Sequence, residues 1–193
     1  MMRIITGRAR GTKLDTLSGE NTRPTAERTK EAVFSILQFH MADARVLDLF
    51  AGSGQLALEA ISRGAKKAIL CDRSKDAVAV IHRNVQKTHF EHECSVFYAD
   101  YQTLLQMLAG KERFDLVFLD PPYASGAVPI ALRGLLTHGL LADGARIVCE
   151  TGEEKDAFGD DLTLSEAFQI LKTTRYGAAF ITILEYHDKE NLL

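Results

Sequence analysis

The segment Phe114–Tyr123 is an apolar run that ends in Asp-Pro-Pro-Tyr. We predict a β-strand that stops at the two prolines, because proline lacks an N–H and turns the chain out of a sheet in a stiff direction. This turn would place the carboxylate of Asp120 beside the carbonyl of Pro121. Two such acceptors can grip the N–H bonds of an exocyclic amino group on a base, and Tyr123 can stack on that base.

An amino nitrogen held in this way has its lone pair aimed at a methyl donor, so catalysis would be mostly positioning, worth roughly 7–11 kcal/mol. A sulfonium methyl donor carries its own leaving group. We therefore expect neither a metal nor a covalent nucleophile, and we assign the catalytic role to Asp120, Pro121 and Tyr123.

A second strand candidate, Val46–Leu49, runs into the glycine turn Ala51–Gly54, which opens a helix. Glycines let the backbone approach a ligand closely at the carboxyl end of a parallel strand. The same stretch also satisfies the loose dinucleotide pattern G-x-G-x-x-G/A. Alone, the turn fits both S-adenosylmethionine and NAD.

Three acids at or just after predicted strand ends suit parts of such a ligand. Asp48 suits the cationic methionine end, Asp72 a ribose and Asp100 an adenine amino group, although an aspartate in such a place can also cap a helix. We predict that S-adenosylmethionine contacts Asp48, Phe50, Gly52, Ser53, Gly54, Asp72 and Asp100.

Strand and helix patterns alternate from Arg45 onward, which is typical of βαβ units with a parallel sheet. The predicted strands are 46–49, 68–71, 95–98, 116–119 and 146–149, followed by 168–172 and 179–186. The predicted helices between them are 55–62, 75–87, 101–108 and 128–136. Because the last two strands are consecutive, we expect an antiparallel hairpin at the end of the sheet.

Residues 1–43 form a predicted N-terminal extension to the domain 44–193, with a short hairpin turning at Gly7 and Gly11 and a helix over 25–38. The buried stripe of that helix is predicted as Ala32, Val33, Ile36 and Leu37.

Charge favours this extension as the site of nucleic-acid contact. Residues 1–40 carry seven Lys or Arg against four acids, whereas the other residues carry 16 against 22. Attraction to phosphate is therefore focused at this end. The predicted RNA contacts are Arg8, Arg10, Lys13, Arg23 and Arg28. Alternatively, Arg23 and Arg28 pair with nearby acids while the extension covers a sheet edge, or Arg23 serves the cofactor pocket.

The composition fits one ordinary globular domain, with 193 residues, 46% hydrophobic and 25% charged. The start of the chain has no apolar signal region, and no stretch approaches the roughly 20 apolar residues of a membrane helix. We expect a cytoplasmic protein without a membrane partner. Three isolated cysteines, Cys71, Cys94 and Cys149, suggest neither a disulfide framework nor a zinc site.

The chain resembles the bacterial 16S rRNA (guanine(966)-N(2))-methyltransferase family over nearly its whole length. The resemblance rests on Arg3–Ile5, Thr22–Thr25, Leu47–Gly54, Ser62–Ala65, Asp120–Tyr123 and Arg175–Gly177. It implies a Rossmann-like, seven-stranded class I methyltransferase fold. The implied substrate is the guanine N2 amino group of 16S rRNA within an assembling small ribosomal subunit. The chain departs from the family pattern at Ala178–Ala179, which leaves substrate detail open.

The same sequence features also fit other functions. Asp-Pro-Pro-Tyr is also found in DNA adenine N6-methyltransferases and, with Asn in place of Asp, in protein glutamine methyltransferases. The glycine turn and Asp72 alone would fit an NAD-dependent oxidoreductase, which leaves Asp-Pro-Pro-Tyr unexplained. A non-enzymatic RNA-binding assembly factor is a further alternative.

Overall fold

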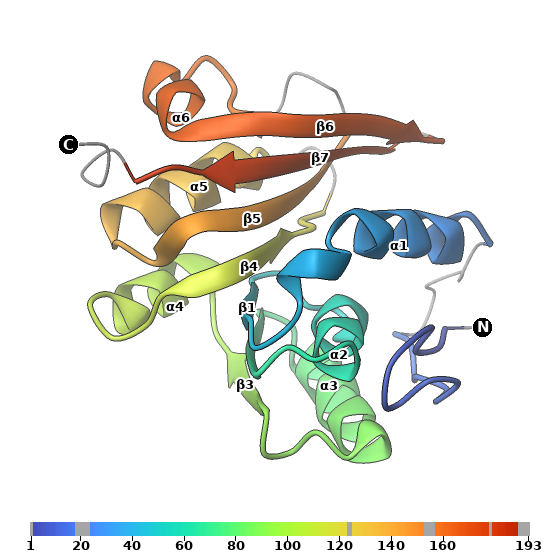
Figure 1. The fold of residues 1–193 in the computed structure, drawn as a ribbon. Helices are drawn as coiled ribbons and strands as arrows, with labels where there is room; N and C mark the ends of the chain where they lie inside the picture. The colour runs from blue at the N-terminus through green and yellow to red at the C-terminus, as the bar shows by residue number, and fades with distance from the viewer. Residues whose placement is uncertain (1, 18–23, 123–124, 153–156, 178, 189–193) are drawn as a thin grey trace.

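The computed structural model describes residues 2–17, 24–122, 125–152, 157–177 and 179–188. Its strands are β1 (Arg45–Asp48), β2 (Lys67–Asp72), β3 (Cys94–Tyr98), β4 (Phe114–Leu119), β5 (Leu141–Thr151), β6 (Phe168–Tyr176) and β7 (Ala179–Tyr186). They form one seven-stranded sheet in the order β3-β2-β1-β4-β5-β7-β6 (Figure 1). Strands β1 to β5 are parallel, while β7 runs antiparallel to both β5 and β6. This confirms the predicted mostly parallel sheet with an antiparallel C-terminal hairpin.

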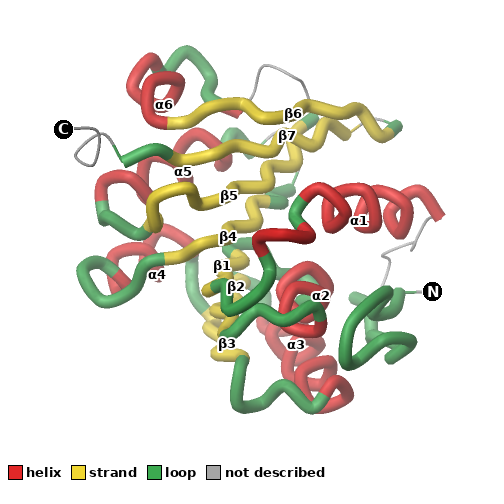
Figure 2. Tube along the Cα trace, viewed as in Figure 1, coloured by secondary structure: helices red, strands yellow, loops and turns green. Residues whose placement is uncertain are grey.

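Helices cover both faces of the sheet (Figure 2). They are α1 (Pro24–Ile36), α2 (Gln55–Ser62), α3 (Lys75–Thr88), α4 (Tyr101–Leu108), α5 (Ala127–Thr137) and α6 (Leu162–Ala167), with a 3-10 turn η1 (Gln38–His40) after α1. One core contains Phe34, Leu58 and Ile81 from α1, α2 and α3. The other core, on the opposite face, receives its helix side chains from α4, α5 and α6. Successive strand residues point to opposite faces, so Val46 lies in the first core and Leu47 in the second.

Two details of α1 differ from the predicted helix. The helix ends at Ile36 and is followed by η1, and the buried stripe is rotated. Phe34 is fully buried and packs against Phe118, with ring centroids 5.8 Å apart, whereas Ile36 is 37% exposed. The prediction for Ile36 was wrong because the large Phe34 ring, rather than Ile36, fills the space above the sheet.

The structure also differs from the prediction at strand 146–149, which is longer, and after it, where there is an additional helix. Strand β5 begins at Leu141, five residues before the predicted start, because the segment with Asp143 and Gly144 stays in the sheet where the register against β4 shifts. Helix α6 was not predicted. It has six residues, and its Asp161 cap accepts from the backbone N–H groups of Thr163 and Leu164.

The N-terminal segment packs along α2 rather than forming regular strands. Its predicted hairpin is reduced to one antiparallel bridge between Arg3 and Lys13. Ile4 and Leu14 are buried in the same core as α1, α2 and α3. The segment is therefore part of the folded body.

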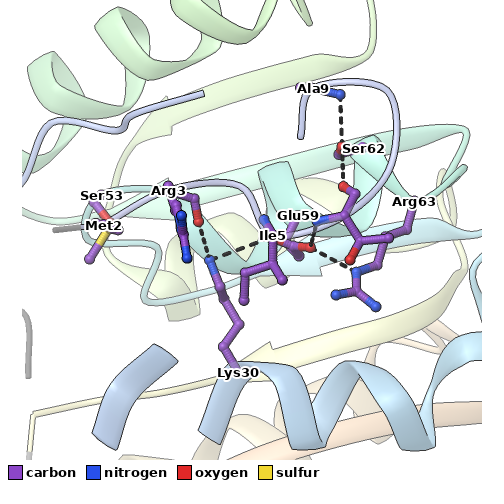
Figure 3. A network of polar contacts seen from close by, with 10 residues as sticks. Met2, Arg3, Ile5, Ala9, Lys30, Ser53, Glu59, Ser62 and Arg63 are labelled. Carbon is purple, nitrogen blue, oxygen red and sulfur yellow. Dashed lines mark hydrogen bonds and ion pairs between the residues drawn. The ribbon is translucent and has the colours of Figure 1, made fainter. Parts of the chain in front are cut away.

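A buried carboxylate, that of Glu59 in α2, holds this segment (Figure 3). Its oxygens accept the backbone N–H groups of Ile5 at 2.8 Å and Thr6 at 3.0 Å. They also accept from Arg63 Nε at 2.8 Å and lie 3.4 Å from Lys30 Nζ, which donates to the Arg3 carbonyl. Glu59 thus binds the extension, α1 and the end of α2 at one point.

The end of α2 makes a second contact with the hairpin turn. The Ser62 carbonyl accepts from Arg8 N, and Ser62 Oγ accepts from Ala9 N. Gly7 has φ +87°, and a Cβ there would lie 1.8 Å from the Ser62 carbonyl oxygen. Glycine is required at this position both for its backbone conformation and for the close approach.

We expect Glu59→Ala to lower the free energy of unfolding by about 3–5 kcal/mol, because it leaves buried cationic and N–H groups without their acceptor. Glu59→Gln keeps one acceptor oxygen and should lose less. Urea denaturation measures both. Glu91→Ala, at an exposed acid, is the control and should stay within about 0.5 kcal/mol of the original protein. A Glu59→Ala variant as stable as this control would contradict the anchoring role.

Candidate cofactor and catalytic site

Four aspartates lie along the carboxyl edge of the parallel strands. Asp48 and Asp72 are the last residues of β1 and β2, while Asp100 and Asp120 follow β3 and β4. Since the strand order is β3-β2-β1-β4, the acids succeed one another along the edge as Asp100, Asp72, Asp48 and Asp120. Neighbouring strands are about 4.8 Å apart, so an elongated ligand lying along this edge reaches all four.

The glycine turn between β1 and α2 faces this edge. Gly52 and Gly54 have φ values of +54° and +79°. A Cβ on Gly52 would meet no atom within 4 Å, so the backbone there is open to a ligand. A Cβ on Gly54 would lie 3.1 Å from a methyl group of Leu70, so this glycine is needed for packing of the turn.

Asp72 holds the turn in place. Its Oδ2 accepts from Gly52 N at 2.9 Å, and its Oδ1 accepts from Ser74 N at 2.8 Å. A carboxylate has about four acceptor sites, so lone pairs remain for the predicted ribose contact. Asp72 therefore has a structural role that the sequence did not reveal, and its ribose role stays a prediction.

Asp48 is buried, with 1% of its surface exposed. The pKa of its carboxyl is raised to about 7, mainly because the group is buried and also because of the nearby charge of Asp72. Hydrogen bonds from the backbone N–H groups of Phe50 and Ala57 lower the pKa and offset part of this rise. Within the described part of the chain, its Oδ1 has no hydrogen-bond partner. A buried acceptor of this kind fits the cationic amino group of a ligand's methionine end.

Two further predicted cofactor contacts lie beside β3 and α4. Phe50 packs against Tyr101, with ring centroids 5.0 Å apart. Asp100 caps α4 by accepting from Gln102 N at 2.9 Å. The cap explains an aspartate at this position without a ligand, so the adenine contact stays a prediction.

The motif after β4 begins as the sequence predicts. Strand β4 ends at Leu119, and Asp120, half-buried, and Pro121, buried, follow at the carboxyl edge. In the register, Asp48 pairs with Phe118, so Asp120 lies two residues beyond the end of the neighbouring strand. The described residues among the predicted catalytic and cofactor contacts are therefore brought to one edge. Tyr123 and Arg23 lie outside the described residues.

Among the described RNA contacts that the sequence predicts, Arg10, Lys13 and Arg28 are exposed. Arg8 pairs with Glu93 at 2.6 Å and lies over the ring of Phe90, 4.6 Å from its centroid. The hairpin turn with Arg8 touches the C-terminal end of α2, so the turn lies toward the amino edge of the sheet, away from the end of β4 (Figure 1).

Sequence reasoning missed Glu59 and Asn84, both fully buried. A weak signal existed for Glu59, because α2 is buried from Ala57 to Ser62 and a charge inside such a helix needs partners. Asn84 in α3 contacts Ser53 and Asp15, which lie 31 and 69 residues away in the chain. Local patterns carry no signal for such contacts.

Comparison with known proteins identifies the family. The family described as Conserved hypothetical protein 95 matches residues 2–185. The chain is 36% identical over 155 residues to ribosomal RNA small subunit methyltransferase D of Haemophilus influenzae, with 80% of each chain covered. It is 34% identical over 154 residues to the Escherichia coli protein of that name, with 79% of this chain and 76% of the relative covered.

The chain belongs to the ribosomal RNA small subunit methyltransferase D family. The solved structure of yhhF from Escherichia coli, assigned as a methyltransferase, superposes with a TM-score of 0.82 at 29% identity and covers 97% of this chain and 99% of that one. Both the resemblance seen in the sequence and the class I methyltransferase fold are confirmed. In this family member, none of the helices in the described ranges is long and apolar enough to cross a membrane. The described residues also contain no group of three or more His, Cys, Asp or Glu side chains that could hold a metal ion.

The raised pKa of Asp48 predicts opposite pH effects on stability and on binding. In the folded state the protonated form is favoured, so the contribution of Asp48 to stability is complete below pH 4 and is lost as pH rises through about 7. At pH 8, Asp48→Asn should therefore be more stable than the original protein without ligand. The gain should be on the order of 4 kcal/mol, at about 1.4 kcal/mol per pKa unit.

S-adenosylmethionine binding should show the reverse trend, because the ionised carboxylate is the form that attracts an ammonium group. Its affinity should fall as pH drops from 7.5 toward 6 in the original protein and stay weak and flat in Asp48→Asn. Titration calorimetry and thermal unfolding across this range check both trends. An affinity of the original protein that does not change with pH would rule out this assignment of Asp48.

Proposed function

We propose that this protein transfers a methyl group from S-adenosylmethionine to the exocyclic N2 amino group of a guanine in 16S ribosomal RNA, the nucleotide of the guanine-966 type. The observation that carries the proposal is the convergence of the glycine turn, Asp48, Asp72 and Asp120 on one sheet edge. Relatives at 34–36% identity that bear the name ribosomal RNA small subunit methyltransferase D support the RNA substrate.

The residues at this edge fit S-adenosylmethionine. Its sulfonium group supplies the methyl group and leaves as a neutral thioether. The buried Oδ1 of Asp48 would hold the ammonium group of the methionine end. The open backbone at Gly52 allows a ligand to approach, and Asp72 beside it would accept from a ribose hydroxyl. Asp100, two strands from Asp48, would accept from the adenine amino group.

Asp120 and the Pro121 carbonyl would hold the two N–H bonds of the guanine amino group. The lone pair of such a nitrogen is delocalised into the ring, and gripping both hydrogens turns it toward the tetrahedral geometry that attack requires. The carboxylate of Asp120 would also stabilise the positive charge that develops on the nitrogen as the N–C bond forms and the C–S bond breaks. The methylated nitrogen then loses one proton, to this carboxylate or to water, and becomes neutral. Tyr123 would stack on the base, a contact worth about 1–3 kcal/mol.

The RNA would also contact the N-terminal extension. A five-residue strand spans roughly 17 Å, so a substrate that touches both the hairpin turn and Asp120 must extend over about that distance. A structured RNA satisfies this, whereas an isolated nucleotide does not. An assembling small subunit is the proposed form of the substrate, since it offers folded RNA with exposed bases.

The direct test is incubation of the protein with S-adenosylmethionine and small ribosomal subunits that lack the modification, followed by mass spectrometry of the RNA. The expected result is one N2-methylguanine. Methylation of adenine in DNA, of a glutamine in protein, or of no substrate would overturn the proposal.

Asp120→Ala should lower the rate constant of transfer by at least about 100-fold while S-adenosylmethionine binding is kept, because Asp120 acts on the nucleophile. Asp120→Asn should retain more activity, since its amide oxygen still accepts one hydrogen bond. Single-turnover kinetics and titration calorimetry separate the two effects. Near-normal transfer by Asp120→Ala would show that the chemical site is misplaced.

Neutralising Arg8, Arg10 and Lys13 together should weaken RNA binding and leave cofactor affinity intact. The slope of log affinity against log salt should flatten by about 0.7–0.9 for each phosphate group that the variant no longer binds. Filter binding over a salt series measures this slope.

The matched control neutralises three exposed cations of the body, Lys111, Arg113 and Lys172. It makes the same change in net charge but should leave the slope nearly unchanged. Equal slopes for the two triple variants would show that these cations of the extension do not bind RNA and that the extension has a purely structural role.

A further inference from the structure

Asn84 in α3 is fully buried, and its side chain joins three segments of the chain. Its Nδ2 donates to the Ser53 carbonyl at 2.8 Å and to the Asp15 carbonyl at 2.9 Å. Its Oδ1 accepts from Asp15 N at 2.7 Å. The amide is thus bonded to the backbone on both sides, with the glycine turn on one side and the extension on the other.

The other end of the extension reaches the same turn. Ser53 Oγ lies 3.1 Å from Met2 Sδ. Ser53, the residue between Gly52 and Gly54, is 4% exposed. Two parts of the extension, at Met2 and at Asp15, therefore meet at the central residue of the turn that would cradle S-adenosylmethionine.

We propose that Asn84 is a positioning residue that makes the conformation of the cofactor turn depend on the seating of the N-terminal extension, so that RNA and S-adenosylmethionine bind with positive cooperativity. The inference rests on the proposed function, which supplies the two ligands.

Asparagine suits this place because the partners of its amide are two carbonyls and one N–H, all on backbone. One side chain supplies both the donors and the acceptor. The turn itself contains two glycines, which restrict φ and ψ weakly. Asp72 fixes the turn at the Gly52 N–H, and Asn84 fixes it at the Ser53 carbonyl. The N–H of the peptide that carries this carbonyl, on Gly54, donates to the Ala51 carbonyl at 2.6 Å, so fixing the peptide fixes the shape of the turn.

The direction of coupling follows from linkage. RNA that holds the extension in place strengthens the Asp15–Asn84 contact and so favours the turn conformation that binds the cofactor. By reciprocity, the cofactor must then tighten RNA binding by the same factor. Asn84 acts through the backbone of Ser53 in the cofactor turn and is remote from Asp120, so its effect should appear in cofactor affinity and in cooperativity rather than in the chemical step.

Asn84→Asp is the sharpest variant, because it keeps the shape of the side chain and replaces the Nδ2 donor by an acceptor facing two carbonyls. We expect the Kd and KM for S-adenosylmethionine to rise about tenfold, while kcat at saturating cofactor stays within about twofold. In the original protein, bound small-subunit RNA should lower the Kd for S-adenosylmethionine severalfold. In Asn84→Asp this gain should disappear.

Two controls separate this role from general damage to α3. Thr88→Val removes a buried hydroxyl one turn further along the helix, which donates to the Asn84 and Val85 carbonyls of its own helix. Asp15→Ala removes the side chain that pairs with Arg83 and Lys87 but keeps the backbone bonded to Asn84. Both should retain the original cofactor Kd and the RNA-dependent gain. Equal Kd values for Asn84→Asp and Thr88→Val would overturn the inference.

Hydrogen exchange in the unaltered protein tests the coupling even if Asn84→Asp fails to fold. Addition of S-adenosylmethionine should slow exchange of the Asp15 amide, whose proton is bonded to Asn84. Unchanged exchange at Asp15, with cofactor binding confirmed by calorimetry, would overturn the inference and leave the proposed function standing. Failure of the unaltered protein to bind S-adenosylmethionine would instead overturn the proposed function.

Discussion

The buried carboxylate of Glu59 is the interaction on which the arrangement of the N-terminal third depends. A carboxylate without solvent is costly unless hydrogen bonds and opposite charges surround it. Here Lys30 from α1, Arg63 from α2 and two backbone N–H groups of the extension supply them. The extension and Glu59 depend on each other. Among its described residues, the extension forms one isolated β-bridge and no regular strand, so Glu59 is needed to hold it. The buried Glu59 in turn has no water to take the place of the N–H groups that the extension donates. Helix α2 therefore carries the glycine turn at one end and the docked hairpin at the other.

The site itself follows from the direction of the strands. Parallel strands place all their carboxyl ends at one edge, so acids separated by 72 residues in sequence, from Asp48 to Asp120, become neighbours in space. Their environments then differentiate them. Asp48 is buried and has a raised pKa, Asp72 is fixed by two backbone N–H groups, and Asp100 is exposed on a helix cap. The buried acid destabilises the protein without ligand at neutral pH, which is the expected cost of a charge kept ready for a cationic ligand.

The sequence was sufficient for the parts of the fold that are governed by local chemistry. Alternating apolar runs predicted all seven strands of the sheet, and the turn was evident from Gly52 and Gly54. The buried face of α1 could not be predicted. Whether Phe34 or Ile36 is buried depends on packing against Phe118, which is 84 residues away from Phe34 in the chain. The contacts of Glu59 and Asn84 could not be predicted for the same reason. Both residues bond to backbone groups, and backbone groups leave no residue-type signature in a sequence.

The hairpin turn and Asp120 lie toward opposite edges of the sheet. Arg8 is bound to Glu93 and Phe90 near the start of β3, whereas Asp120 follows the end of β4. In the proposed function, the RNA contact and the chemical site are thus separated by about the length of the strands. Because Ser53 touches both Met2 and, through Asn84, Asp15, the extension is connected to the cofactor turn along α2 and α3. Under the proposed function, an extended RNA bound at the hairpin would act on the same segment that packs against the turn, so the length of the substrate would be sensed through the extension.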